Sequence, residues 1–195
     1  MIGTILSALL GFAIFWRQNK GERLGGPIAP SKGLWLYWTI YVWFLFIPYT
    51  LLTDQWPDAF LWGWGFLSLS MWLRGIAEMY MLFVSKNWTP KIGISHDFFT
   101  LAGLIFFYVY GHQSFISAAW WVQAFAIALV ISLSVEIWYA YAFLKLVREK
   151  TKGDKAIWYA SKEDPQFLKI LRVTTAFNIL LYGVVAIFIW QFGVN

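Results

Sequence analysis

Two charged side chains interrupt the apolar segment SMWLRGIAEMYML, residues 70–82. Arg74 and Glu78 are four residues apart, so on a helix they share one face and can form an ion pair. A charged side chain at the bilayer centre costs roughly 2.5–3.5 kcal/mol on insertion scales, and by default it marks a functional site. The chemistry that this pair could perform therefore depends on whether the segment lies in a membrane and on which other polar side chains lie at the same depth.

A second carboxylate, Glu136, lies in another apolar segment. It belongs to an i,i+4 series of mostly small residues: Ala124, Ala128, Ser132, Glu136 and Ala140. Small residues at this spacing favour close packing of two helices. We therefore expect Glu136 to lie at a helix–helix contact.

The composition is that of a membrane protein. Hydrophobic residues make up 60% of the chain and charged residues 13%, against roughly 45–50% and about 25% in soluble domains. Aromatic residues reach 22%, with 14 tryptophans, and tryptophan is enriched where helices cross the membrane–water interface. The absence of cysteine excludes disulfides, thiolate metal sites and cysteine nucleophiles.

The elements that position these side chains are helices long enough to cross a bilayer, which takes about 20 mostly apolar residues. Six segments are candidates: 1–16, 34–52, 59–84, 98–115, 120–146 and 173–192. The sequence thus predicts an all-α, polytopic helical membrane protein with about six transmembrane helices. We expect one transmembrane bundle over residues 1–195, with a cytoplasmic helical connector at about 146–172 in which EDPQFLKIL leads into the last span.

The basic residues separate the connections by charge. Fourteen of the 15 lie at 17–32, 86–91 and 145–172, after the first, third and fifth segments, and the fifteenth is Arg74. The positive-inside rule makes these connections cytoplasmic and the topology N-out and C-out. Segment 1–16 carries no basic residue ahead of its apolar run, which favours a retained helix over a cleaved signal peptide.

This distribution also bears on localisation and partners. It is typical of an integral protein of a bacterial-type inner membrane, and it makes the basic charge a topology signal instead of a nucleic-acid footprint. The expected partners are the lipid bilayer and either other membrane subunits or a second copy in a homo-oligomer. Anionic lipid headgroups are a secondary interpretation of the basic face.

The topology sets the depth of the carboxylates. Glu78 lies eight residues before Lys86, and Glu136 nine residues before Lys145. Both spans run in the same direction, so the two carboxylates are expected at similar depth in the cytoplasmic half of the membrane.

The last span contributes Asn178, six residues beyond Arg172. The sequence therefore predicts one buried polar cluster: Arg74, Glu78, Glu136, Asn178 and Tyr139. It can be a structural clamp between spans, a site that handles protons or cations, or an acid–base pair. The function we favour is a component that handles protons, ions or a small solute within a larger membrane complex. The alternatives are an accessory scaffold subunit and an intramembrane enzyme that modifies a lipid or isoprenoid.

A second pair, His96 and Asp97, lies at the expected cytoplasmic entrance of span 98–115, where Asp97 is placed to start the helix. Joined to Glu78 and Glu136, the pair could form a Mn or Fe site, but no E-x-x-H or H-x-x-x-H spacing supports one, and we predict no metal. His112 lies about 24 Å from His96 along a helix, which excludes haem ligation by the two. We predict no cofactor.

No nucleophile constellation is apparent either. The serines within the spans lack a histidine at their depth: Ser70, Ser132 and Ser134. The sequence also has no G-x-S-x-G motif. Whether the protein is an enzyme therefore stays open at the level of sequence.

Overall fold

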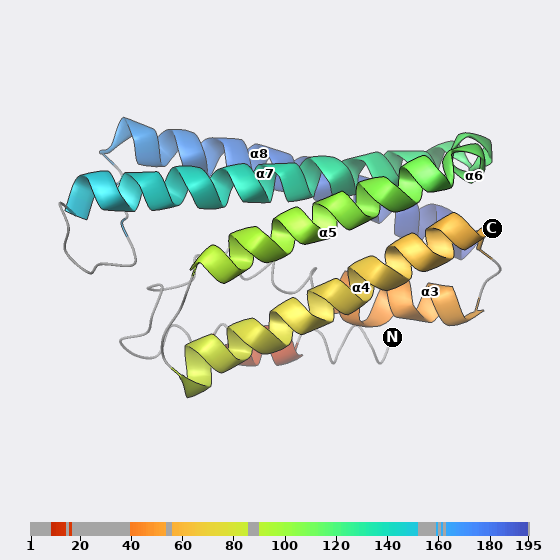
Figure 1. Ribbon diagram of the computed structural model, residues 1–195, viewed down its shortest axis with the longest axis horizontal. Helices are drawn as coiled ribbons and strands as arrows, with labels where there is room; N and C mark the ends of the chain where they lie inside the picture. Colours follow the sequence, from red (N-terminus) through yellow and green to blue (C-terminus); the bar gives the residue numbers. More distant parts are fainter. Residues whose placement is uncertain are drawn as a thin grey trace. The chain divides into compact units, whose positions relative to one another are not determined.

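The computed structural model describes most of the apolar part of the chain. The residues described are 9–14, 16, 40–53, 56–85, 90–151, 159, 161 and 163–194. In this part every regular element is helical (Figure 1), which confirms the all-α prediction. Parts of the predicted spans and connections, at 1–8, 17–39 and 152–158, lie outside the described residues.

The chain divides into two compact units. Unit 1 comprises Met1–Trp56 and Trp64–Thr89, and unit 2 comprises Pro57–Gly63 and Pro90–Asn195. The single bundle expected from the sequence stays a prediction.

Unit 1 is held together by aromatic side chains. A π-helix, η1 (Ile40–Phe46), leads directly into α3 (Ile47–Thr53). The α4 helix (Asp58–Met79) follows, with its residues up to Gly63 in unit 2 and those from Trp64 in unit 1, and it is extended by a second π-helix, η2 (Tyr80–Val84). The ring of Phe44 stacks on that of Trp72 at 4.8 Å, and the two rings of Trp56 and Trp64 meet edge to face at 4.9 Å.

Gly75 explains how η1 approaches α4 within this unit. A Cβ atom built at this glycine would lie 2.8 Å from Cζ of Phe44, closer than real Cβ contacts allow. The missing side chain therefore makes room for the Phe44 ring.

Unit 2 contains three long helices. They are α5 (Pro90–Tyr110), α7 (Trp120–Thr151) and α8 (Pro165–Val194), with a short helix, α6 (His112–Ser117), between the first two. Both α5 and α8 pack on α7, as Figure 1 shows. Phe125 of α7 and Phe188 of α8 are almost fully buried and stack at 4.3 Å, so the core of this unit follows the α7–α8 contact.

The register of α7 against α8 can be read from two contacts. Near one end, Lys150 Nζ lies 2.9 Å from Asp164 Oδ2, and near the other Phe125 stacks on Phe188. The stretch of α7 from Phe125 to Lys150 is nearly as long in sequence as the stretch of α8 from Asp164 to Phe188. Both helices have the same rise per residue. Residues equally far from the Lys150–Asp164 contact therefore lie level with one another.

Three helices are long and apolar enough to cross a membrane, within the described part of the chain: Lys91–Tyr110, Trp120–Thr151 and Pro165–Phe192. The apolar helix Ile40–Thr53 is shorter than a span needs. The α4 helix has the length but includes Arg74 and Glu78, which lower its hydropathy. The chain thus has the helices of a membrane protein, while the number of six spans and the orientation stay predictions.

The helix ends correct the predicted spans. The fourth begins at Pro90, eight residues before the predicted start at 98, because KIGISHD continues the helix. At the other end, α7 extends to Thr151 beyond the apolar run, and α8 begins at Pro165, so both helices continue into the predicted connector, whose cytoplasmic position stays a prediction.

Candidate functional site

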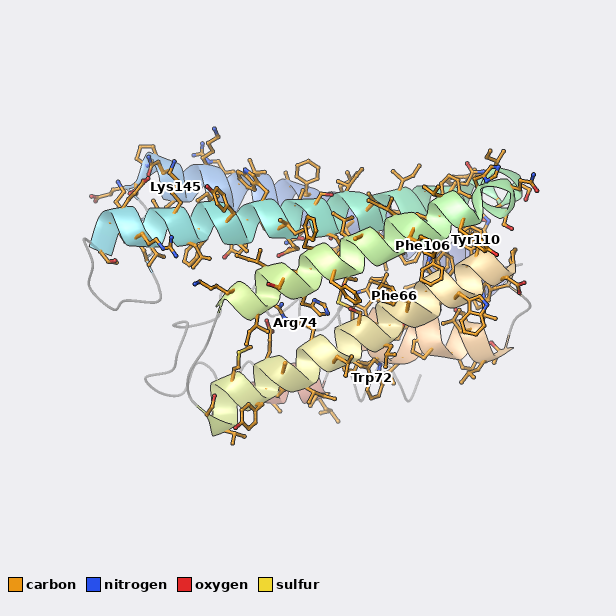
Figure 2. The ribbon with its side chains drawn as sticks, viewed as in Figure 1. Phe66, Trp72, Arg74, Phe106, Tyr110 and Lys145 are labelled. Carbon is orange, nitrogen blue, oxygen red and sulfur yellow. The ribbon has the colours of Figure 1, made fainter. Side chains whose placement is uncertain are left out.

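The predicted ion pair on α4 is confirmed. Both Nε and Nη2 of Arg74 lie 2.8 Å from Oε1 of Glu78, and the side chains are 20% and 31% exposed. Figure 2 labels Arg74 on this helix. Because the two residues are one turn apart, the helix itself brings them together.

Glu136 lies where the small-residue series predicted a helix contact. It is half-buried on α7 and interacts electrostatically with Tyr139 of the same helix and Tyr182 of α8. The ring of Tyr139 stacks on Phe143 at 5.8 Å, which limits its freedom. Glu136 therefore shares its surroundings with phenol groups from two helices.

The register also places Asn178 at the level of this group along the helices. Glu136 precedes Lys150 on α7 by the same sequence separation as Asn178 follows Asp164 on α8, so the two lie level. Thr174 is one turn from Asn178 and donates its hydroxyl hydrogen to the carbonyl of Ile170 at 2.9 Å. Within unit 2, Glu136 thus interacts with Tyr139 and lies level with Asn178, while one site formed by the three residues stays a prediction.

The predicted cluster is split between the units. Glu136, Tyr139 and Asn178 belong to unit 2, whereas Arg74 and Glu78 belong to unit 1. A single site that contains all five residues stays a prediction.

His96 and Asp97 differ from the expected helix cap. The helix begins at Pro90, so Asp97 lies in its second turn, and the prediction that it starts the helix is wrong. His96 Nδ1 lies 3.0 Å from Asp97 Oδ1, and His96 Nε2 lies 3.5 Å from Oγ1 of the fully buried Thr100. Both side chains of the pair are 15% exposed. Sequence reasoning missed Thr100, although its i,i+4 spacing from His96 was the available signal.

The depth of His96 is close to that of Glu136. The end of α5, at Tyr110, and the start of α7, at Trp120, meet at α6 (Figure 1). Counted along α5 and α7 from these two helix ends, His96 and Glu136 are almost equally far, and they lie within about one turn of each other along the bundle. His96 is therefore at the depth of the polar group and not at the end of the span.

A second polar network, which the sequence analysis did not single out, joins the charged ends of α7 and α8. Oδ1 of Asp164 accepts hydrogen bonds from the backbone N–H groups of Gln166 (2.8 Å) and Phe167 (3.3 Å), as an N-cap does. Its Oδ2 accepts one from Tyr159 OH (2.8 Å) and pairs with Lys150 (2.9 Å). The bond from Lys150, then that from Tyr159 and the backbone, lowers the pKa of Asp164 to about 2. An Asp directly before Pro is the sequence signal for such a helix start.

Metal chemistry has no donor set in the described residues. No group of three or more His, Asp or Glu side chains there is arranged to hold a metal ion. A comparison of the chain with protein-family models finds no match, and comparisons with curated proteins and with solved structures find none either.

Proposed function

We propose that the chain is a component of a larger complex in a bacterial-type inner membrane, with both termini outside. In this proposal it handles protons, ions or a small solute. Glu136 is the side chain that gains and loses the proton. The predicted polar cluster is the site, and Arg74 with Glu78 sets its electrostatic field.

The observation that carries the proposal is the position of Glu136 at the α7–α8 contact. The carboxylate interacts with the phenols of Tyr139 and Tyr182 and lies level with Asn178. A phenol can donate a hydrogen bond to an ionised carboxylate and accept one from a protonated carboxyl group. Such surroundings accommodate both protonation states, which a proton carrier must visit in turn.

The ion pair of α4 supports a different role for Glu78. Arg74 directs two nitrogens at one oxygen of this carboxylate. Glu78 is thus engaged by an ion pair within its own helix, whereas Glu136 lies among phenol groups of two helices.

The test is proton flux into proteoliposomes that contain the full chain and a pH-sensitive dye. Glu136→Gln removes the titrating group at nearly constant volume, and we expect it to abolish flux while the protein still folds. The matched control is Glu149→Gln on the same helix, which changes the same functional group at an exposed position that is 45% accessible. Normal flux in Glu136→Gln, or the absence of flux in the wild type, would refute the proposal.

The second candidate is a scaffold subunit whose polar residues only hold helices together. The ion pair between Arg74 and Glu78 favours the scaffold role, because two opposite charges that pair within one helix need no function beyond stabilising it. In this case Glu136→Gln changes stability or assembly, and no activity depends on pH.

A further inference from the structure

A groove lies between α7 and α8, within unit 2. Its volume is about 240 Å³. On the α7 side the groove is lined by the small side chains of Ala124, Ala128 and Ser132. On the α8 side it is lined by larger side chains such as Phe177 and Leu181. The small-residue series that includes Glu136 thus forms part of a groove and not only a closed helix contact.

The rim of the groove is exposed although it is apolar. Ile127 is 49% exposed and Leu180 is 55% exposed, whereas Ala128 at the floor is only 8% exposed. In a helix that crosses a bilayer, such a rim faces hydrocarbon. The lining suits an alkyl chain, because it offers contact area and almost no polar group.

The groove face continues to two exposed lysines at the charged end of the helices. Lys145 follows Ile127 on α7 by about five full turns, and Lys169 precedes Leu180 on α8 by about three turns. Lys145 also lies five residues before Lys150, and Lys169 lies five residues after Asp164, so the two lysines are level. Figure 2 labels Lys145 at this end of α7.

The charges of these lysines are available to a ligand. Lys145 is 66% exposed and lies 3.8 Å from the carboxylate of Glu149. Lys169 is exposed and makes no ion pair within the described part of the chain. The carboxylate of Asp164 is already engaged by Lys150 and Tyr159. A pair of level cations at the end of an apolar groove complements an anionic headgroup with its chain.

The spacing fits one leaflet of a membrane. The near edge of the groove, at Phe177, is about 12 Å from Lys169 along the helix. Half of the hydrocarbon core measures about 15 Å. A chain whose headgroup lies at the lysines therefore reaches the groove with its terminal part.

We propose that the groove between α7 and α8 binds an acyl chain of an anionic phospholipid whose headgroup is held by Lys145 and Lys169. The occupant is a lipid, because the cations lie at the end of the apolar face and at the distance that a lipid places between phosphate and chain end. The site is independent of proton handling, and its test needs no transport activity.

The experiment is native mass spectrometry of the purified full chain, titrated with phosphatidylglycerol or phosphatidylcholine of identical acyl chains. We expect the wild type to retain phosphatidylglycerol about thirtyfold more tightly, since each of the two lysines near the headgroup contributes about 1 kcal/mol. The double variant Lys145→Gln with Lys169→Gln should lose this preference.

The matched control is Arg148→Gln with Arg172→Gln. It removes the same charge at the same end, but about 60° further round each helix from the groove. Arg148 is about half a turn out of phase with Ala128 on α7, and Arg172 is about half a turn out of phase with Leu181 on α8. The control should keep the preference for phosphatidylglycerol. An equal loss in both double variants would show a diffuse charge effect and overturn the site.

Binding of the acyl chain is tested separately, by substitutions that fill the groove. Ala124→Leu, or Leu180→Trp at the exposed rim if the first variant fails to fold, should weaken retention of both lipids by a similar factor. Unchanged retention in a folded groove variant would overturn the proposal. So would a change in oligomeric mass without a change in bound lipid, because a second copy of the chain would then be the occupant.

Discussion

Two ion pairs among the described residues, Arg74–Glu78 and Lys150–Asp164, differ in how the chain brings their partners together. Arg74 and Glu78 lie one turn apart on α4. Lys150 and Asp164 come from the ends of two helices and meet at 2.9 Å. The first contact needs only a helix, while the second needs α7 and α8 to pack in one register.

Their surroundings differ as well. The α4 pair lies in an otherwise apolar segment, where a charge left without its partner is poorly solvated. The carboxylate of Asp164 has four hydrogen-bonding partners and lies at the charged ends of α7 and α8. We therefore expect the local pair to matter more for stability, although it is the simpler of the two.

The largest effect is expected when the α4 pair is broken. Glu78→Gln leaves the Arg74 guanidinium in the apolar segment without its carboxylate, and we expect the free energy of unfolding to fall by about 2–3 kcal/mol. The measurement is reversible unfolding in mixed micelles followed by circular dichroism.

Two variants control for this effect. Arg74→Gln with Glu78→Gln removes both charges and should be less destabilised than Glu78→Gln alone. Glu149→Gln breaks the exposed 3.8 Å pair with Lys145, and a change within about 0.5 kcal/mol is expected. If Glu78→Gln is no worse than Glu149→Gln, the contrast between the two surroundings is wrong.

The next effect concerns a packing contact between helices that the sequence spacing does not reveal. A Cβ atom built at Gly111 would collide with Cβ of Ala59, at the start of α4. Gly111→Ala should therefore destabilise unit 2 by about 1–3 kcal/mol, as overpacking does. The same unfolding measurement checks it.

The matched variant is Gly183→Ala on α8, where an added Cβ meets nothing within 4 Å. This change should be neutral or stabilising, because alanine favours the helix. Ala59→Gly in the Gly111→Ala background should restore part of the loss. If all three variants behave alike, the close approach of Gly111 to Ala59 does not limit stability.

The features that could be predicted from the sequence are those that form within one helix, and the features that were missed depend on contacts between helices or on polar helix ends. The all-α class and the Arg74–Glu78 pair depend on composition and on spacing within one helix, and both are confirmed. The start of α5 at Pro90 was missed, because a polar helix end in KIGISHD has no apolar signal. The pairing of Asp164 with Lys150 was missed because the two residues belong to different helices, and only the register of α7 against α8 joins them.

The predicted cluster illustrates the limit of depth arguments. Distance from the charged ends placed Glu136 and Asn178 at one level, and the contacts of α7 with α8 give the same level. Depth alone carries no information on which helices are neighbours. For that reason the relation of Arg74 and Glu78 to Glu136 stays a prediction.

The smallest effect is expected at the Lys150–Asp164 pair, and its pH dependence separates charge from capping. Asp164→Asn keeps a side-chain oxygen for the N–H groups of Gln166 and Phe167 and removes the negative charge. At pH 7 we expect slightly faster hydrogen exchange in the first turn of α8, measured as protection factors, and Lys150→Gln should resemble it.

The sign of the pH effect follows from the lowered pKa. An unfolded aspartate titrates near about pH 3.9, whereas the pKa of Asp164 in the folded chain is about 2, so the unfolded state takes up the proton first as the pH falls. The contribution of the carboxylate is complete above about pH 4 and is lost between about pH 4 and about pH 2. The difference in protection between wild type and Asp164→Asn should disappear over this range. A difference that persists at pH 2 would assign the effect to the geometry of the cap and not to the ion pair. The charge of Asp164 would then not contribute to the stability of the Lys150–Asp164 contact.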